Sequence, residues 1–317
     1  MHISVIGCGR WGSFIAWYLD HIGQHITLYG RSGSAKMQQF LDTRTNGLIT
    51  LPPSVKLTTD LRCVVGADAV LISIGAQQLR SLMQQLAPYD LHGKIFILCM
   101  KGIDTETLER LSEIVQRAAP DNRVAVWLGP GHVQEFYAGV PNCMVIDSAD
   151  EDLKRLLVDS FSSDLIRFYY GADLLGNEVG AAAKNVVGIA AGMLDGAGVS
   201  SLKGALMSRG TREIARLISA MGGNELSAYG LCHLGDYEAT VFSKYSHNRR
   251  FGEAFVRGED YTELAEGYYT VKALVRLSEK YGVDLPICRA VYHMLYENGE
   301  KGETLKSLFA RSIKNEF

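Results

Sequence analysis

The sequence predicts an α/β half followed by an all-helical half. Two observations lead to this fold class. Short, continuous apolar runs alternate with segments of helical period as far as about residue 175, which is typical of a mostly parallel sheet covered by helices on both faces. Beyond that point only helical periods occur, interrupted by glycine-rich breaks.

The first thirty residues contain two predicted strands with a helix between them. The strands are His2–Ile6 and His25–Tyr29, and the amphipathic stretch Ser13–His21 lies between them. The segment from residue 7 to residue 12 reads G-C-G-R-W-G and directly follows the first strand. A lone G-x-G-x-x-G is a weak signal, but between a strand and a helix it is the dinucleotide-binding fingerprint of a Rossmann-like domain.

Each glycine of this fingerprint has its own physical task. Gly7 permits the tight turn, Gly9 allows the backbone to approach a pyrophosphate, and Gly12 allows the helix to pack closely on the strand. The N–H groups at the start of the helix, next to Arg10 and Trp11, then favour an anion. The sequence therefore predicts a cofactor site at this turn.

Further apolar runs extend the predicted sheet. They are Ala69–Ile74, Lys94–Cys99 and Val124–Leu128, with weaker candidates at Cys143–Ile146 and Ile166–Tyr169. Ligands of such sheets bind at the carboxyl ends of the strands. Lys101 and Gly129 follow two of these ends.

The second half reads as helices only. The predicted helices are Glu178–Gly196, Leu202–Met221, Tyr261–Tyr281 and Pro286–Tyr296. We therefore expect a dinucleotide-binding domain at 1–174 and a helical substrate-binding and catalytic domain at 175–317.

Composition excludes several classes of function. The formal net charge of −3 over 317 residues gives no basic surface for nucleic acid. No apolar run reaches the roughly 18 residues of a membrane-spanning helix, and the chain opens directly on a strand rather than on a signal peptide. The six cysteines lack C-x-x-C spacing and the eight histidines lack metal-site spacing, so we expect reduced thiols, a cytoplasmic location and no metal.

The residues after the second strand bear on the choice of cofactor. Sites specific for NAD usually place an Asp or Glu here for the ribose 2′-hydroxyl, and none is present. Arg31, with Ser32 and Ser34, can instead bind a 2′-phosphate. We therefore favour NADP(H), with NAD(H) as the alternative if Arg31 is only a solvated loop residue.

Three polar clusters in the helical half carry candidate chemistry. Lys184 and Asn185 interrupt a strongly apolar helix, where a lysine is costly to bury without a role or a partner; the alternative is a lysine that extends to solvent. Desolvation would also suit this lysine to proton transfer near neutral pH. The other clusters are 235–240, G-D-Y-E-A-T, and 246–252, S-H-N-R-R-F-G.

These motifs, in this order and at this spacing, resemble the bacterial soluble type of NAD(P)-dependent sn-glycerol-3-phosphate dehydrogenase over nearly the whole chain. The motifs are G-x-G-x-W-G at 7–12, K-G-I at 101–103, G-P at 129–130 with Glu135, E-x-G at 178–180, K-N-V at 184–186, D-G at 195–196, R-G at 209–210, L-G-D at 234–236 with Thr240, N-R-R-F-G at 248–252 and E-G at 266–267.

The resemblance implies reversible hydride transfer between NAD(P)H and dihydroxyacetone phosphate, giving glycerol 3-phosphate for glycerophospholipid synthesis. It implies that Lys184 is the general acid and base, that Lys101 polarises the carbonyl and helps lower the pKa of Lys184, and that Asp236 holds substrate hydroxyls and orients Lys184. Family members are often dimers, so we expect a homodimer. The residues implied to bind substrate are Lys101, Gly129, Asn185, Asp236, Thr240, Asn248 and Arg249. Those implied to bind cofactor are Gly7, Gly9, Arg10, Trp11, Gly12, Arg31, Lys101, Arg249 and Glu266.

The chain also departs from the family pattern. His247 stands where the family has a phosphate-binding arginine, and Arg249 or Arg250 would have to compensate. Ile74-Gly75-Ala76 replaces a Val-Pro-Ser, and Gly131-His132 replaces Ser-Phe or Thr-Phe. Two rival hypotheses therefore stay open: a related β-hydroxyacid or ketopantoate-type reductase, and a non-catalytic NAD(P)-binding sensor.

Overall fold

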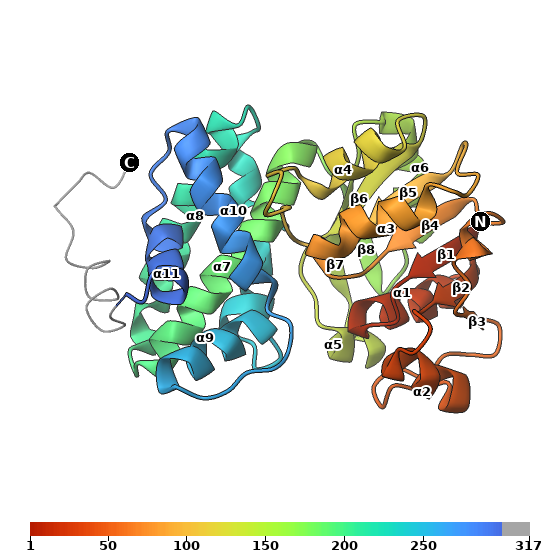
Figure 1. Ribbon diagram of the computed structural model, residues 1–317, viewed down its shortest axis with the longest axis horizontal. Helices are drawn as coiled ribbons and strands as arrows, with labels where there is room; N and C mark the ends of the chain where they lie inside the picture. Colours follow the sequence, from red (N-terminus) through yellow and green to blue (C-terminus); the bar gives the residue numbers. More distant parts are fainter. Residues whose placement is uncertain (300–317) are drawn as a thin grey trace. The chain divides into compact units, whose positions relative to one another are not determined.

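The computed structural model describes residues 1–299, and the chain within it forms two compact units. The first comprises residues 1–101 and 109–174, and the second comprises 102–108 and the chain from 175 on. Figure 1 labels the helices and strands of each unit. Residues 300–317 of the expected second domain lie outside the described residues.

The segment 102–108 belongs to the helical unit, although the expected boundary assigned it to the first domain. Ile103 is buried in the hydrophobic core of the helical unit, and Arg276 of that unit donates to the carbonyl oxygen of Thr105. A boundary drawn along the sequence cannot include such an excursion, because only tertiary contacts produce it.

The first unit contains a mixed sheet with the strand order β3-β2-β1-β4-β5-β6-β7-β8. The strands are β1 His2–Ile6, β2 His25–Tyr29, β3 Lys56–Thr58, β4 Ala69–Ile72, β5 Ile95–Leu98, β6 Arg123–Leu128, β7 Asn142–Asp147 and β8 Ile166–Tyr170. Neighbours run parallel except β7, which is antiparallel to β6, so the expectation of a mostly parallel sheet is confirmed. The three-residue β3 was not expected, because it is defined by pairing with β2 rather than by an apolar run.

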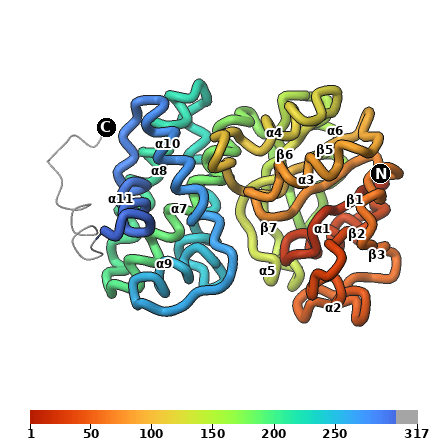
Figure 2. Tube along the Cα trace, in the orientation of Figure 1, coloured from red at the N-terminus to blue at the C-terminus, as the bar shows by residue number. Residues whose placement is uncertain are grey.

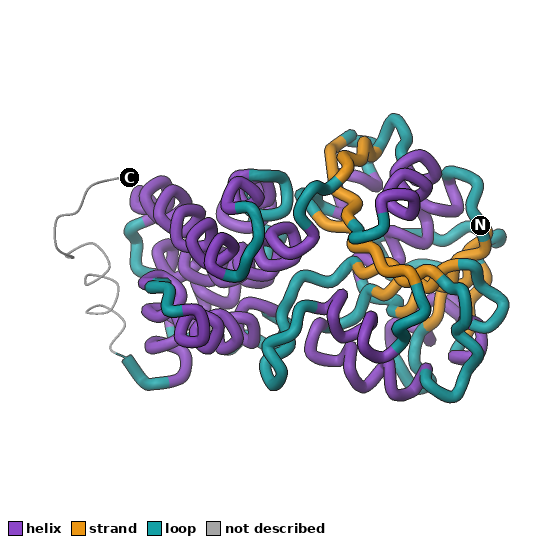
Figure 3. The backbone as a smooth tube through the Cα atoms, turned by 90° about the horizontal axis from the view of Figure 1, so that it is seen from above, coloured by secondary structure: helices purple, strands orange, loops and turns teal. Residues whose placement is uncertain are grey.

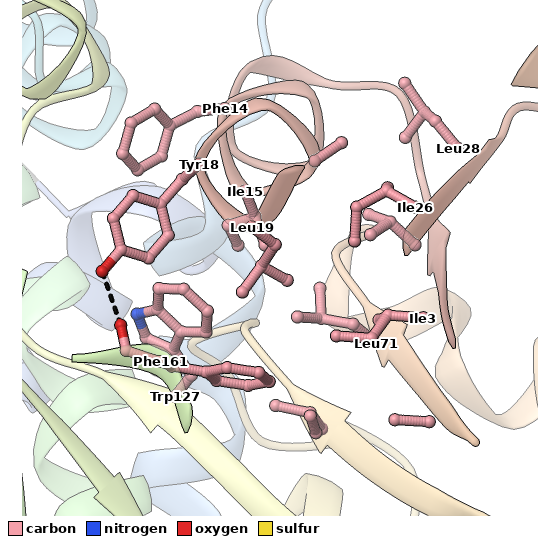
Figure 4. Packing of buried hydrophobic residues seen from close by; sticks show 14 of the residues in the cluster. Ile3, Phe14, Ile15, Tyr18, Leu19, Ile26, Leu28, Leu71, Trp127 and Phe161 are labelled. Atoms are coloured by element: carbon pink, nitrogen blue, oxygen red, sulfur yellow. Dashed lines mark hydrogen bonds between the residues drawn. The ribbon is translucent and has the colours of Figure 1, made fainter. Parts of the chain in front are cut away.

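Alternate residues of each strand face opposite sides of this sheet, and both sides are buried along the central strands β1, β4 and β5. Ile3 and Val5 of β1 join a core that includes Phe14, Trp127 and Phe161, and Figure 4 shows Ile3 in the same cluster as these aromatic residues. Ser4 alternates with them along the strand, so its side chain belongs to the other side of the sheet, where it is also buried. Helices cover the sheet: α1 Arg10–His21, α2 Ala35–Thr43, α3 Leu79–Leu86, α4 Leu111–Ala118, α5 Val133–Tyr137 and α6 Glu151–Phe161. Burial on both sides explains why the strands read as continuous apolar runs.

The described part of the second unit is helical, and Figure 3 shows strands only in the other unit. Its α-helices are α7 Leu174–Gly196, α8 Lys203–Ala220, α9 His247–Arg257, α10 Glu266–Tyr281 and α11 Pro286–Tyr296. Within residues 1–299 of the chain, the structure also has 3-10 turns at Leu61–Val64, Ala76–Gln78, Ser200–Leu202, Glu225–Tyr229 and Leu234–Asp236, and a π-helical turn at Glu238–Phe242. The expected helix start at Tyr261 is wrong: α10 begins at Glu266, and the Tyr261 hydroxyl binds His247 from the preceding loop.

Helix α7, green in Figure 2, forms the centre of the helical core. It is buried continuously from Gly176 to Leu194, as expected of a helix that is apolar on every side. Glycines bring its neighbours unusually close. A Cβ atom added at Gly192 would lie 1.9 Å from the carbonyl oxygen of Arg249, and one added at Gly252 would lie 2.1 Å from that of Ile189. Helix α9 therefore touches α7 through backbone.

Candidate active site

The glycine turn after β1 has the geometry that a dinucleotide requires. Gly7 adopts φ +113°, and a Cβ there would lie 2.2 Å from the Ser73 carbonyl oxygen. A Cβ at Gly12 would lie 1.8 Å from the Gly7 carbonyl oxygen. A Cβ at Gly9, in contrast, would meet nothing within 4 Å. Two glycines thus permit close packing, and the third leaves open space at the N-terminus of α1, which fits a pyrophosphate.

Trp11 and Arg10 begin the helix that follows this turn. The Trp11 ring packs edge-on against Phe14 and Phe136, with ring centroids 5.6 and 6.3 Å away. The Trp11 side chain therefore packs at the edge of the hydrophobic core, and its contact with cofactor stays a prediction. Arg10 is the first residue of α1.

The loop after β2 gathers positive charge beside the glycine turn. Arg31 is exposed, and the Ser34 hydroxyl caps α2 by accepting from the Met37 N–H. Burial raises the pKa of the Cys8 thiol, while a hydrogen bond with Ser34 and the charges of Lys36 and Arg31 lower it in part. Lys36 was not expected from the sequence; its position in the first turn of α2 was the available signal.

Lys101 and Gly129, both predicted from the sequence, lie together in the first unit. They follow the ends of the paired strands β5 and β6, and Lys101 Nζ donates to the Gly129 carbonyl oxygen at 2.7 Å. Gly129 adopts φ +122°, which only glycine accepts readily, and this places its carbonyl oxygen within reach of Lys101.

Lys184 forms a buried ion pair with Asp236. Its Nζ lies 2.8 Å from Asp236 Oδ2, and the two side chains are 9% and 1% exposed. The same Nζ donates to Thr240 Oγ1 at 2.7 Å, and the Thr240 hydroxyl donates to the Asp236 carbonyl oxygen at 2.7 Å. The structure thus joins three predicted residues into one cluster, and the lysine does not extend to solvent.

Unusual backbone geometry supplies Asp236 and Thr240 as partners of Lys184. Asp236 ends the 3-10 turn Leu234–Asp236, and Thr240 lies in the π-helical turn Glu238–Phe242. Such π turns are rare and occur often at functional sites. The pair of turns presents a carboxylate and a hydroxyl to one ammonium group, where each serves as a hydrogen-bond acceptor.

Asn185 and Asn248 form a second polar cluster beside the first. Asn248 Nδ2 donates to Asn185 Oδ1 at 2.9 Å, and Asn248 Oδ1 accepts from the Gly267 N–H at 2.9 Å. These contacts join α7, α9 and the start of α10. Both amide side chains are held in defined orientations, as is needed for binding a phosphate or hydroxyl group.

Arg249 is engaged in an internal ion-pair network. Its Nε lies 2.6 Å from Asp195 Oδ2, and Lys203 Nζ lies 2.7 Å from the same oxygen. Burial raises the pKa of Asp195, but hydrogen bonds from Lys203 and Ser200 and the charge of Arg249 outweigh burial and lower it. The network ties α7, α8 and α9 together, so the expected contact of Arg249 with phosphate or cofactor remains a prediction. Lys203 was not expected from the sequence, because no motif marks it.

His247, which replaces the family's arginine, begins α9 and faces an acidic loop. Its Nδ1 lies 2.7 Å from Glu263 Oε2 and 2.9 Å from the Tyr261 hydroxyl. Arg250, a candidate to compensate for it, lies 3.9 Å from Glu263. Glu266 begins α10, and its contact with cofactor stays a prediction.

Two further findings concern metal sites and membrane-spanning helices, and both apply to residues 1–299. No set of three or more His, Cys, Asp or Glu side chains there is arranged to hold a metal ion. Over the same residues, no helix combines the length and apolar character needed to cross a bilayer.

Family models match both halves of the chain. Residues 2–154 match the N-terminal model of NAD-dependent glycerol-3-phosphate dehydrogenase, and residues 173–306 match its C-terminal model. The chain belongs to the NAD-dependent glycerol-3-phosphate dehydrogenase family. The resemblance inferred from the motifs is confirmed, and with it the assignment to the NAD(P)-dependent oxidoreductases.

Relatives match along their full length. A glycerol-3-phosphate dehydrogenase [NAD(P)+] of Thermoanaerobacter sp. (strain X514) is 33% identical over 100% of this chain and 99% of its own. One of Bradyrhizobium sp. (strain ORS 278) is 35% identical over 99% and 98%. The crystal structure of glycerol-3-phosphate dehydrogenase from Coxiella burnetii superposes with a TM-score of 0.93 at 26% identity, over 98% of this chain and 99% of that one.

The fold is also shared with more distant enzymes. A ketopantoate reductase from Ralstonia eutropha JMP134 superposes with a TM-score of 0.63 at 15% identity, over 96% of this chain and 100% of that one. This likeness concerns the fold alone. The family match favours glycerol-3-phosphate dehydrogenase over the ketopantoate-type alternative.

Proposed function

We propose that this member of the family reduces dihydroxyacetone phosphate to sn-glycerol 3-phosphate, reversibly, with Lys184 as the proton donor. The observation that carries the proposal is the Lys184–Asp236–Thr240 cluster, a buried ammonium group with two oriented acceptors. Burial of an ammonium group is costly unless it is paired and hydrogen-bonded, and here both acceptors are held at the same Nζ. The usual family role, supply of the glycerophospholipid backbone, is part of this proposal.

The chemistry divides between cofactor and chain. When bound, the reduced nicotinamide supplies the hydride that the carbonyl carbon receives. In reduction, the N–H bond of Lys184 breaks and an O–H bond forms on the substrate's carbonyl oxygen; in oxidation, the amine of Lys184 takes the proton back. Proton transfer from a positioned group contributes roughly 10²–10⁴-fold.

The other polar residues orient the reaction. Asp236 and Thr240 hold Lys184 Nζ in one direction and bind substrate hydroxyl groups. Asn185 and Asn248 bind phosphate oxygens, which agrees with their fixed amides. Lys101, held by the Gly129 carbonyl oxygen, is proposed to polarise the substrate carbonyl.

We further propose that NADP(H) is preferred to NAD(H). Support comes from the exposed Arg31, from Lys36 beside the same turn, and from the lack of an acidic residue directly after β2. A 2′-phosphate binds strongly to such charged donors. The glycine turn serves either cofactor.

A homodimer in the cytoplasm completes the proposal. The family resemblance supports the dimer. The six cysteines, which the structure has as thiols and not as disulfides, support a reducing compartment. Light scattering on the purified protein tests the dimer directly.

The function is tested by NADPH oxidation with dihydroxyacetone phosphate, followed by the loss of reduced-nicotinamide absorbance and repeated with NADH. Saturable turnover that disappears in a Lys184→Met variant supports the proposal. Turnover with ketopantoate in place of dihydroxyacetone phosphate would contradict it in favour of the related reductases. A protein that binds NADPH but oxidises it with neither ketone would contradict it in favour of a sensor.

A further inference from the structure

A buried histidine lies directly beside the catalytic cluster, and the proposed reaction leaves it without a role. His233 is 0% exposed and begins the run that leads to Asp236. Its Nδ1 lies 2.8 Å from the Gly180 carbonyl oxygen of α7, and its Nε2 lies 2.8 Å from the Tyr237 hydroxyl. Tyr237 is also 0% exposed, and its ring meets the His233 ring edge-on at 4.9 Å.

The partners determine which imidazole nitrogen carries the proton. A carbonyl oxygen only accepts, so His233 Nδ1 must donate to Gly180, and Nε2 must accept from the Tyr237 hydroxyl. Burial lowers the pKa of His233 to about 4, with a further contribution from the charge of Lys184. The hydrogen bond to Gly180 and the charge of Asp236 raise this pKa in part. The imidazole is therefore neutral near neutral pH, in one defined tautomer.

Gly180 lies one helical turn before Lys184 on α7. In an α-helix its carbonyl oxygen is also the acceptor for the Lys184 N–H, so His233 binds to the very turn that carries the lysine. A Cβ at Gly180 would lie 3.0 Å from His233 Cβ, so the glycine is what permits this close approach. The two segments are thus joined twice, by the bond from His233 to Gly180 and by the ion pair of Lys184 with Asp236.

A second attachment is needed because the Asp236 segment has little stability of its own. It is a three-residue 3-10 turn followed by a π turn, and both are weakly stable geometries. Tyr237 links this segment to α8, since its hydroxyl lies 3.5 Å from Thr211 Oγ1. A small movement of the segment would change the direction of the Lys184 N–H bonds.

We propose that His233 and Tyr237 are positioning residues, which hold the Asp236 segment against α7 so that the carboxylate orients Lys184 for proton transfer. Neither residue touches substrate or cofactor in this role. The proposal rests on the function assigned above to Lys184 and Asp236.

The test compares substitutions that remove different hydrogen bonds of this pair. Tyr237→Phe removes the hydroxyl and keeps the ring, and His233→Leu removes both imidazole bonds. His233→Asn keeps a side-chain N–H near the position of Nδ1. Tyr18→Phe is the matched control, because Tyr18 is equally buried and its hydroxyl donates to the Phe161 carbonyl oxygen in the other unit (Figure 4).

We expect Tyr237→Phe and His233→Leu to lower kcat by about tenfold or more and to leave KM for the cofactor unchanged. The pH at which kcat falls to half of its maximum should also shift in both variants. His233→Asn should restore much of kcat. Tyr18→Phe should lower the melting temperature by about as much as Tyr237→Phe does. Its kcat and the pH profile of kcat should equal those of the wild type.

Folded Tyr237→Phe protein with wild-type kcat and pH profile would overturn the proposal, even if its melting temperature fell. Tyr237→Phe decides the matter if His233→Leu does not fold. All comparisons start from the turnover of the wild type with dihydroxyacetone phosphate. Absence of that turnover would contradict the proposed function, whereas wild-type kcat in Tyr237→Phe would contradict only the positioning role. The failure of one proposal is therefore distinguishable from the failure of the other.

Discussion

Lys184 Nζ and Asp236 Oδ2 lie 2.8 Å apart, with both side chains almost fully removed from solvent. A buried charge that loses its partner costs about 3–5 kcal/mol, whereas loss of both charges is often tolerated. With Lys184 as the proposed proton donor, the pair makes catalysis and stability depend on the same contact. The effect of the pair on catalysis can be separated experimentally from its effect on stability.

Lys184→Met should lower kcat by at least about a hundredfold, because the proton donor is lost while a chain of similar volume remains. Cofactor binding, measured by fluorescence titration, should persist. The single variant should also unfold at lower urea concentration, because the buried Asp236 carboxylate loses the ammonium group that lies 2.8 Å away in the wild type.

The double variant Lys184→Met/Asp236→Leu should regain much of that lost stability without regaining activity. Urea unfolding of both variants measures the difference. If the double variant is no more stable than the single one, the Asp236 charge is not the source of the instability.

Asp236→Asn should change the pH dependence of the reduction. The carboxylate favours the ammonium form of its neighbour, so its replacement by an amide should move the alkaline fall in kcat to lower pH and reduce the maximum by about tenfold. Steady-state rates over a pH series give both quantities. An unchanged profile would remove Asp236 from the mechanism.

Arg31→Ala and Lys36→Ala should each raise KM for NADPH by about tenfold or more and leave KM for NADH nearly unchanged. The reason is that charge-assisted hydrogen bonds to a 2′-phosphate are worth about 1.5–3 kcal/mol. Arg155→Ala, which removes an exposed arginine of α6, is the control. Equal effects on the two cofactors would exclude recognition of a 2′-phosphate at this loop.

Glu213 should make stability depend on pH. Its carboxylate accepts from the N–H groups of Ile287 and Cys288 at the start of α11, at 2.9 and 3.0 Å. Burial raises its pKa from 4.5 to about 7, although these hydrogen bonds lower it in part. The folded chain thus binds this proton more tightly than the unfolded chain. The contribution to stability is complete below pH 4.5 and is lost as pH rises through about 7.

That loss amounts to about 3 kcal/mol, since one pKa unit corresponds to about 1.4 kcal/mol. Glu213→Gln should therefore show a flatter dependence of unfolding free energy on pH between about 5 and 8 than the wild type. Urea unfolding at several pH values tests this. Parallel curves for the two proteins would mean that Glu213 stays charged in the folded state.

The local sequence predicted the bounds of a helix or strand correctly where a single hydrophobic pattern or a marked end determined that element. β1 and β2 match their expected bounds, because strands buried on both faces read as unbroken apolar runs. Helix α11 does as well, since Pro286 marks its first residue. Strand β3 was missed because its three residues carry no apolar run and are paired only through β2.

Much of the candidate site was also visible in the sequence, but its arrangement was not. The apolar setting of Lys184 marked it as unusual, and the motifs pointed to Asp236 and Thr240. That one ammonium group binds both partners follows only from the packing of two short turns on α7. The role of Arg249 in holding Asp195 was likewise invisible in the sequence.

By itself, then, the sequence determined the fold class, the glycine turn and the family, because these depend on local periodicity and on the spacing of motifs. Tertiary structure alone decided that Lys36 lies beside the turn, that His233 binds the turn of α7 that carries Lys184, and that Lys203 pairs with Asp195. The physical reason is that hydrogen bonds and ion pairs depend on distances of a few ångströms between residues far apart in the chain, and only the packed core establishes those distances.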